Sequence, residues 1–304
     1  DQRLSRGLGD VYKRQVMSGT QDIVIGGGVE VMSMVPIGAA VKDGYDAGHG
    51  LPFDSEGMKE RYPGVFFSQF TGAELVADKW NLSREDLDKF ALESHQKAAH
   101  ATESKYFDRE ILPVEGRNAE GMNDLVMADE GIRFDASLDK LAGLNPVTEG
   151  GVITAGNASQ ITDGAAAVMV CNDAGLKKIQ ANPRAEIVSI SVVGDDPVFM
   201  LTGPIPASIQ ALETANLTID DMDLYEVNEA FAPVPLAWAE DLKADRSKLN
   251  VNGGAMALGH PLGATGAKLM TTLLHEMERR ESTYGLQAIC EGGGTANATI
   301  IKRI

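Results

Sequence analysis

The sequence predicts an α/β fold, because apolar runs of strand length alternate with stretches of helical periodicity in its second half. The runs at 165–171, 185–193 and 224–227 are each followed by a helical segment. Gly occurs 33 times, often in clusters, which indicates tight loops around a site rather than low complexity. No short-period repeat is visible.

The first half of the chain is less regular. Residues 1–15 show neither a helical nor a strand period, and we expect them to lie outside the fold. The apolar run at 22–25 predicts a buried strand, and the glycines at 26–28 predict a tight turn that ends it. Residues 31–70 are rich in Gly and Pro and are expected to form loops.

Two helices are expected next. In the first, apolar residues between Ala73 and Trp80 recur at helical spacing, and the second begins after Ser83, whose spacing to Asp86 fits a capping box. Residues 108–150 are mixed and polar, which is typical of surface loops. The remaining pattern predicts strands at 165–171, 185–193, 224–227, 286–290 and 296–301, and helices that begin near Asp173 and span 205–215, 231–242 and 263–280.

Composition excludes several classes of protein. A net charge of −17 argues against nucleic acid or an anionic membrane as a partner. No apolar run is long enough to span a bilayer, and no signal peptide is visible at the start. The chain has only two cysteines, Cys171 and Cys290, so we expect no disulfide framework and a reducing, cytoplasmic compartment.

Asn228 is the first candidate site residue. It directly follows the expected strand 224–227 and begins the segment 228–232, Asn-Glu-Ala-Phe-Ala. Open α/β folds place their sites at the carboxyl ends of strands, before the next helix. Taken alone, Asn228 fits an ordinary helix cap equally well.

His260 is the second candidate and lies in the Gly-rich segment 252–266. Glycines allow a ligand to approach the backbone closely, and His can act as a general base near neutral pH. The alternative is a core His held by loop carbonyls. The remaining histidines are expected to be solvated or structural: His49, His95, His100 and His275.

Cys290 is the third candidate. It ends the expected strand 286–290 and precedes Glu291 and three glycines. Such a turn exposes a thiol together with backbone N–H groups that can form an oxyanion hole. A lone Cys is more often a buried, inert thiol, but the glycine run favours the functional interpretation. Cys171 ends another apolar strand and is expected to lie in the core.

Four segments together resemble the thiolase family, in whose order and spacing they occur. They are residues 156–167, 228–232, 252–266 and 290–294. A single Gly-rich loop would be weak evidence, but four motifs in register are specific. The resemblance extends from about Val16 to Ile304 and does not include residues 1–15.

The resemblance implies a two-step acyl transfer. In the family, a thiolate attacks the 3-keto carbon of a 3-ketoacyl thioester, acetyl-CoA leaves as an enolate that must be protonated, and CoA then attacks the acyl-enzyme. The reverse reaction is a Claisen condensation. The partners implied are acyl-CoA thioesters, with coenzyme A as substrate and no permanently bound cofactor or metal. A homodimer or homotetramer is also implied.

The resemblance also assigns roles to the candidate residues. Cys290 matches the acid/base that moves the C2 proton, which suits a thiol whose pKa can approach neutrality. His260 matches the base that activates the nucleophile and contacts the thioester oxygen. Asn228 matches the residue that holds a water in that oxyanion hole, and the backbone N–H of Gly292 matches half of a second one.

The fold implied is the thiolase fold, with two similar α/β halves in five layers, an inserted loop domain and an incomplete first half. Ser159 matches a contact to the pantetheine arm of CoA, and Arg133 lies in the region of its adenine end. The expected segments are a non-family part at 1–15, a remnant of the N-terminal thiolase domain at 16–30 and 151–175, a CoA-binding loop domain at 31–150, and a C-terminal thiolase domain at 176–304.

The nucleophile is expected to be missing. In the family it is a Cys in a Gly/Ser-rich turn before the helix that matches the segment ending near residues 17–19. Counting back places it near Gln2, where the chain has neither a Cys nor such a turn. We therefore expect this chain to be inactive and to lack the strands that normally precede this point.

Two alternatives remain open from the sequence. One is an inactive CoA-binding fragment. The other is a ketosynthase-type condensing enzyme, but those relatives have a second His where this chain has Cys290, which favours a thiolase. Residues 68–74 depart from the Met-Gly pattern of short-chain biosynthetic thiolases and are closer to relatives that act on longer or bulkier acyl groups.

Overall fold

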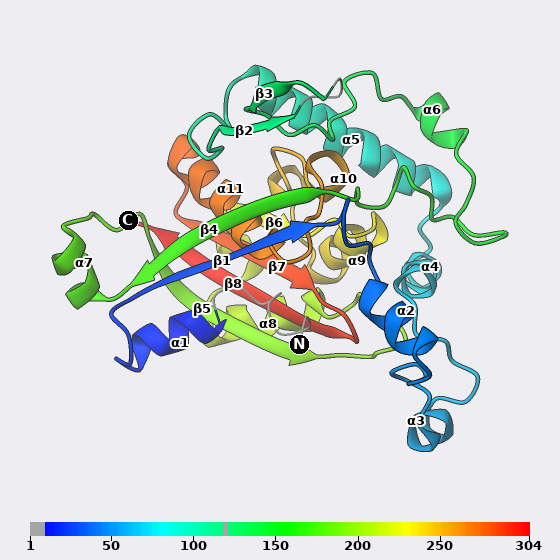
Figure 1. Cartoon of the computed structure of the whole chain (residues 1–304). Helices are drawn as coiled ribbons and strands as arrows, with labels where there is room; N and C mark the ends of the chain where they lie inside the picture. The colour runs from blue at the N-terminus through cyan, green and yellow to red at the C-terminus, as the bar shows by residue number, and fades with distance from the viewer. Residues whose placement is uncertain (1–9, 118–120) are drawn as a thin grey trace.

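A computed structural model describes residues 10–117 and 121–304 (Figure 1). The helices are α1 (Asp10–Met17), α2 (Ala39–Asp46), α3 (Glu56–Arg61), α4 (Gln69–Lys79), α5 (Arg84–Glu103), α6 (Leu138–Ala142), α7 (Asp173–Ile179), α8 (Pro204–Ala215), α9 (Pro233–Leu242), α10 (Ala255–Leu258) and α11 (Thr265–Arg280). The strands are β1 (Ile23–Val31), β2 (Val114–Arg117), β3 (Asn123–Val126), β4 (Asp163–Cys171), β5 (Ala185–Gly194), β6 (Leu224–Val227), β7 (Tyr284–Cys290) and β8 (Thr295–Arg303). The alternation predicted for the second half is confirmed.

The C-terminal half is built on a four-stranded sheet of order β5-β8-β7-β6. β6 and β7 are parallel, whereas β8 is antiparallel to both of its neighbours. The main apolar core lies between this sheet and helices α8 and α9, where the Tyr225 and Trp238 rings meet edge to face at 5.2 Å. Because Trp238 also donates a hydrogen bond to Ser208 Oγ (2.8 Å), its buried N–H has a partner.

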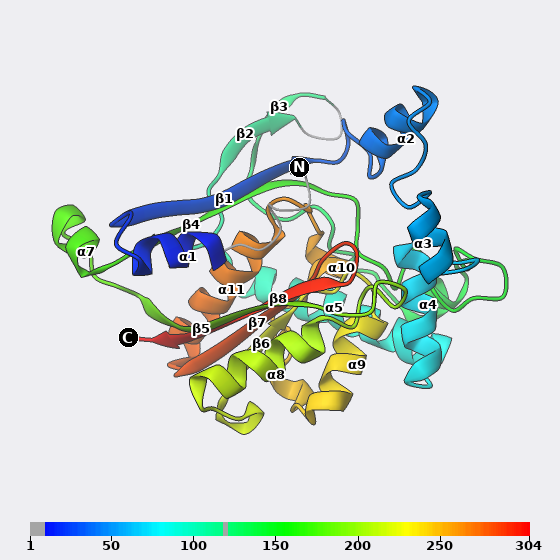
Figure 2. The same cartoon turned by 90° about the horizontal axis from the view of Figure 1, so that it is seen from below.

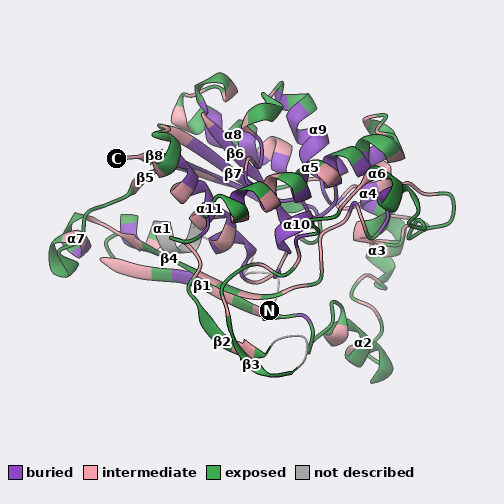
Figure 3. Ribbon diagram, turned by 90° about the horizontal axis from the view of Figure 1, so that it is seen from above, coloured by how far each residue is buried: buried purple, intermediate pink, exposed green. Residues whose placement is uncertain are grey.

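The N-terminal half contains a two-stranded antiparallel ribbon of β1 and β4. α1 and α11 lie between this ribbon and the four-stranded sheet, with α8 and α9 beyond the sheet (Figure 2). The described residues therefore form four of the five expected layers. The outer face of the ribbon carries Ile25, Val29 and Met169, which are 65%, 67% and 54% exposed. In Figure 3, β1 and β4 are coloured mostly as intermediate and exposed, whereas β6 and β7 are mostly buried.

The ribbon corrects three expectations. The glycines at 26–28 do not form a turn but continue β1. A glycine is needed at position 28 because a Cβ there would collide with the carbonyl oxygen of Gly263, in the loop that crosses the strand. Cys171 is only partly buried, since the ribbon is covered on one face alone. Residues 10–15, expected to lie outside the fold, belong to α1. The other residues of the expected non-family segment lie outside the described part of the chain.

The segment between the two ribbon strands is less irregular than expected. α2 and α3 occupy the stretch predicted as loops, and neither has a buried residue. α4 begins at Gln69, a few residues before the predicted apolar face. The capping box of α5 is confirmed: Ser83 accepts from the Asp86 N–H, and the Asp86 carboxylate accepts from the Ser83 N–H. No helix in the described ranges is long and apolar enough to cross a membrane.

Glu110 joins this inserted segment to α11. Thr272 Oγ1 donates a hydrogen bond to Glu110 Oε1 (3.0 Å), and His275 Nδ1 lies 3.4 Å from Oε2. Burial lowers the pKa of His275, so this contact is not an ion pair at neutral pH. Burial raises the pKa of Glu110 from 4.5 to about 7, against a smaller opposing effect of the Thr272 hydrogen bond.

Glu110 should therefore make stability depend on pH. Because its pKa is higher in the folded than in the unfolded chain, its contribution is fully present below pH 4.5 and is lost as the pH rises through about 7. A pKa difference of this size corresponds to about 3 kcal/mol. Glu110→Gln keeps the acceptor for Thr272 and removes the titration. Urea unfolding of both proteins at pH 5 and pH 8 should show a smaller loss in the variant, whereas the exposed Glu213→Gln should follow the parent. Equal losses in all three proteins would contradict this assignment.

Candidate active site

Asn228 and His260 meet at the carboxyl end of β6. The Asn228 Nδ2 atom lies 3.3 Å from His260 Nε2. Asn228 is 1% exposed, whereas His260 is only partly buried. The loop that carries His260 thus returns to the strand end at which Asn228 begins its motif, as the carboxyl-end rule for α/β sheets predicts.

The hydrogen bonds of His260 fix its tautomer. Thr265, the first residue of α11, donates its hydroxyl proton to the Pro261 carbonyl (2.9 Å). The same hydroxyl lies 2.6 Å from His260 Nδ1 and must therefore accept a proton from it. Nε2 is then the unprotonated nitrogen, and the Asn228 amide donates to it. A neutral His in this tautomer can accept a proton at Nε2.

The other end of the Asn228 amide has no partner among the described residues. Its Oδ1 atom is buried and accepts no hydrogen bond. The helix-cap interpretation is wrong, because α9 begins at Pro233 and its N-cap residue, Ala232, makes no side-chain cap. A buried acceptor without a donor is costly, so this oxygen is suited to a polar ligand group or a water.

Cys290 and Gly292 lie at the neighbouring strand end. The Asn228 N–H donates to the carbonyl of Ala288 in β7 (3.0 Å), two residues before Cys290. The Cys290 side chain is 8% exposed. Gly292 is exposed, and its N–H has no acceptor among the described residues. The parallel pairing of β6 and β7 thus brings three of the four predicted catalytic residues to one sheet edge, and the fourth, His260, contacts Asn228.

The turn after Cys290 has a specific reason for its glycines. Gly293 and Gly294 adopt φ values of +79° and +81°, which L side chains rarely reach. A Cβ at Gly294 would also lie 2.8 Å from the carbonyl oxygen of Asp195. Glu291, held by a hydrogen bond from Asn297 Nδ2 (2.6 Å), anchors the turn. The backbone N–H of Gly292 is therefore held in a defined position.

Glu229 links the segment 228–232 to the Gly-rich loop that carries His260. Sequence analysis did not single out this residue. Its Oε2 accepts from the Ser94 hydroxyl (2.7 Å) and from the Met256 N–H (3.2 Å). Its Oε1 accepts from Asn250 Nδ2 (2.8 Å). Burial raises the pKa of this carboxyl, while the three donors favour its charged form. A Cβ at Gly254 would collide with the same carboxylate, which explains that glycine.

A cavity of about 450 Å³ opens beside these loops. Its wall includes the predicted Arg133 together with Gly156 and Gln160 from the predicted linker. The remaining lining residues are His95, Asp135, Ala136, Ser137, Lys140, Leu141, Leu144, Ala155 and Met256. The cavity combines the Arg133 side chain with small residues such as Ala155 and Gly156, whereas Lys140, which also lines it, is paired with Asp135. A guanidinium beside small residues suits a long ligand with a phosphorylated end.

Ser159 and His95 lie near the cavity in different ways. Ser159 is not among the residues that line it, and its N–H donates to the Ala230 carbonyl (2.9 Å), which places it beside the Asn228 motif; its contact with a pantetheine arm stays a prediction. His95 is buried and lies on the cavity wall, where Nδ1 accepts from the Arg133 N–H (3.1 Å). Burial, and then the Arg133 charge, lowers the pKa of His95. No local sequence signal distinguishes it from the other helical histidines.

Comparison with protein families decides the identity. The model described as "Thiolase, N-terminal domain" matches residues 10–174, and "Thiolase, C-terminal domain" matches residues 181–303. The chain belongs to the thiolase family. The match begins at residue 10, so it includes part of the segment that sequence analysis had placed outside the family.

Known thiolases are similar over nearly the whole chain. The steroid 3-ketoacyl-CoA thiolase FadA6 of Mycobacterium tuberculosis is 51% identical over 95% of this chain and 70% of its own length. An acetyl-CoA acetyltransferase of Shinella zoogloeoides is 43% identical, over 96% of this chain and 74% of its own. The crystal structure of human mitochondrial 3-ketoacyl-CoA thiolase superposes with a TM-score of 0.83 at 37% identity, over 96% of this thiolase and 74% of that chain.

The family assignment favours a thiolase over the ketosynthase alternative, and the roles expected for the individual site residues stay predictions. The site near Gln2, where the nucleophile is expected, lies outside the described residues. The segment boundaries at 16–30, 31–150, 151–175 and 176–304 also stay predictions.

Proposed function

We propose that this thiolase site performs CoA-dependent cleavage of 3-ketoacyl-CoA to acetyl-CoA and a shortened acyl-CoA, or the reverse Claisen condensation. The contact between Asn228 and His260, at the sheet edge that also ends in Cys290, carries the proposal. It brings a basic nitrogen, a thiol and hydrogen-bond donors to one place, as acyl transfer through an enolate requires.

In the proposed reaction, His260 takes the proton of the attacking thiol at Nε2. The thiolate adds to the 3-keto carbon, the C2–C3 bond breaks, and its electron pair passes into the enolate of acetyl-CoA. Cys290 donates the proton to C2. Asn228 acts on the thioester oxygen through a water, and the Gly292 N–H stabilises the other oxyanion. The CoA thiol then gives its proton to the Cys290 thiolate and attacks the acyl-thioester, which releases the shortened acyl-CoA and the nucleophilic thiolate, and His260 returns its proton to that thiolate.

The nucleophile in this scheme is a third cysteine that the 304 residues do not contain. We propose that it precedes the helix α1 in the complete active form. An inactive CoA-binding protein remains the second candidate for this chain, because its cavity and the Asn228–His260 contact do not depend on that residue.

We further propose that residues 31–150 form the CoA-binding segment, with Arg133 near the adenine end and Ser159 beside the pantetheine arm. The 51% identity to a steroid 3-ketoacyl-CoA thiolase supports a bulky acyl group, in agreement with residues 68–74. In these residues, Phe70 lies edge to face against Phe231 of the catalytic motif, with ring centroids 5.5 Å apart. We also propose that the protein forms a homodimer or a homotetramer and acts in the cytoplasm.

Removal of the Arg133 charge should weaken CoA binding. Because a charge-assisted hydrogen bond to phosphate contributes about 1.5–3 kcal/mol, we expect Arg133→Ala to raise the Kd of CoA about tenfold or more. Isothermal titration of CoA into the chain measures this effect, and raised salt should reduce the difference. Lys177→Ala removes a similar charge from α7 and serves as control. If both variants bind CoA with equal affinity, Arg133 does not contribute to the binding site. If the unaltered chain binds no CoA, the proposed function is contradicted.

A further inference from the structure

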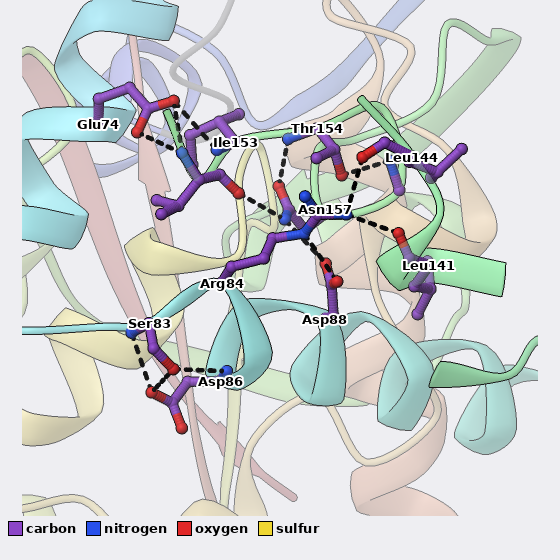
Figure 4. Close-up of polar contacts among 12 residues, drawn as sticks. Glu74, Ser83, Arg84, Asp86, Asp88, Leu141, Leu144, Ile153, Thr154 and Asn157 are labelled. Atoms are coloured by element: carbon purple, nitrogen blue, oxygen red, sulfur yellow. Dashed lines mark hydrogen bonds and ion pairs between the residues drawn. The ribbon is translucent and has the colours of Figure 1, made fainter. Parts of the chain in front are cut away.

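A partly buried ion pair between Arg84 and Asp88 lies next to the cavity, and neither residue is among those that line it. Asp88 of α5 is 3% exposed, and its Oδ2 accepts from Arg84 Nε at 2.7 Å (Figure 4). Its Oδ1 accepts from Asn157 Nδ2 at 3.0 Å. These three residues, which we call the Arg84–Asp88–Asn157 relay, connect α5 to the linker before β4.

One end of the relay holds the part of the cavity wall at the end of α6. The Nη2 atom of Arg84 donates to the carbonyl oxygens of Leu141 (2.6 Å) and Leu144 (3.1 Å). Both leucines line the cavity at the end of α6. A guanidinium can serve the carboxylate and these carbonyls at once because its donors form a rigid, planar fork.

The other end of the relay holds an adjoining part of the same wall, because the Leu141 and Leu144 side chains pack against Gly156. Asn157 Oδ1 accepts from the Thr154 N–H (2.8 Å), and Nδ2 also donates to the Val152 carbonyl (3.0 Å). The loop closed by these bonds contains Ala155 and Gly156, which line the cavity. Glu74 of α4 fixes the start of the same loop by accepting the N–H groups of 152 and 153 (Figure 4).

The relay also reaches the catalytic loop. The backbone carbonyl of Asn157 accepts from the Ala232 N–H at 2.9 Å. Ala232 closes the motif that begins with Asn228, so Asn157 connects this part of the cavity wall to the segment that carries the catalytic amide. α5 already has a capping box and an apolar face that stabilise it, and an ion pair whose Arg84 side chain is 24% exposed contributes little to stability by itself.

We propose that Arg84 and Asp88 are positioning residues that hold the end of α6 against the loop 152–157, set the shape of this side of the cavity and thereby set the affinity for the CoA arm. The inference rests on the proposed function for the identity of the ligand. It adds a role for residues that touch neither ligand nor catalytic groups.

The test compares two Arg→Lys variants of the full chain. Arg84→Lys keeps the charge but cannot hold Asp88 and two carbonyls together, so we expect the Kd of CoA to rise about tenfold. Arg184→Lys is the matched control, because Arg184 makes a two-pronged pair with Glu278 at 2.7 and 2.8 Å, away from the cavity. It should change stability but leave the Kd within about twofold. Equal Kd values for Arg84→Lys and the control would overturn the proposal.

Two further measurements separate the possible failures. If Arg84→Lys does not fold, Asp88→Asn provides the same comparison, since it keeps an acceptor for Asn157 and loses the charge opposite Arg84. Amide hydrogen exchange of Thr154 and Gly156 should be faster in Arg84→Lys than in Arg184→Lys even without CoA. If the unaltered chain binds no CoA, the proposed function fails, but this exchange difference still tests the relay. Unchanged exchange would overturn the relay itself.

Discussion

The 304-residue polypeptide is expected to show no thiolysis and no covalent acylation by 3-ketoacyl-CoA. Its two thiols explain why. Cys171 ends β4 at the far end of the ribbon, where it pairs with Ile23 near α7 (Figure 1). Cys290 is placed by the family resemblance on the proton side of the reaction, and moving it to the carbonyl would leave no acid for C2. Loss of a nucleophile lowers turnover by about 10⁶-fold in well-studied hydrolases.

A form that carries the family's cysteine turn before Val16 should be active. Both proteins are assayed with acetoacetyl-CoA and with a longer 3-ketoacyl-CoA, and acylation is followed by mass spectrometry. A restored form with Ser in place of the new Cys is the matched control. Turnover by the polypeptide as printed would show that the nucleophile is misassigned. A restored form that folds but neither turns over nor becomes acylated would contradict the proposed mechanism.

Glu229→Ala should give the largest loss of stability among substitutions near the site. It leaves three buried donors without their acceptor: the Ser94 hydroxyl, the Asn250 amide and the Met256 N–H. Each such group costs about 1–3 kcal/mol, so we expect the free energy of unfolding to fall by about 3–5 kcal/mol.

Urea unfolding at pH 7 measures this loss. Glu240→Ala on the exposed face of α9 removes only a surface pair with Lys243 and should change stability by less than about 0.5 kcal/mol. The loss for Glu229→Gln should lie between those of the two other variants. Its amide oxygen can still accept a hydrogen bond, but its NH₂ group would face N–H and O–H donors and find no acceptor. A loss for Glu229→Ala no larger than that of the control would show that the carboxylate does not join the two loops.

The elements predicted best are those whose signals are local. The strands and helices between 185 and 304 were predicted to within about two residues at most ends, because each has its own period and end signal. The same is true of the capping box at Ser83 and of the glycine turn after Cys290, whose positive φ values only glycine adopts readily. The conformation of each of these features depends mainly on residues that are close in the sequence.

The wrong predictions concern contacts between distant segments. Nothing around Gly28 shows that Gly263 will cross it, so a strand looked like a turn. His95 is buried and hydrogen-bonded, as a structural histidine is expected to be, but its place on the cavity wall could not be inferred, because His100 has the same helical surroundings. Cys171 ends an apolar run, but one face of its ribbon is uncovered in the described residues.

Residue order and periodicity are enough to identify the family resemblance, the α/β alternation of the second half and the chemical groups available for acyl transfer. How these groups act together depends on the folded arrangement of distant segments. The pairing of Asn228 with His260, the tautomer imposed by Thr265 and the carboxylate of Glu229 all follow from which loops meet. Hydrogen bonds across long sequence separations form where strand ends and helices bring their atoms within about 3 Å, and no local period encodes that meeting.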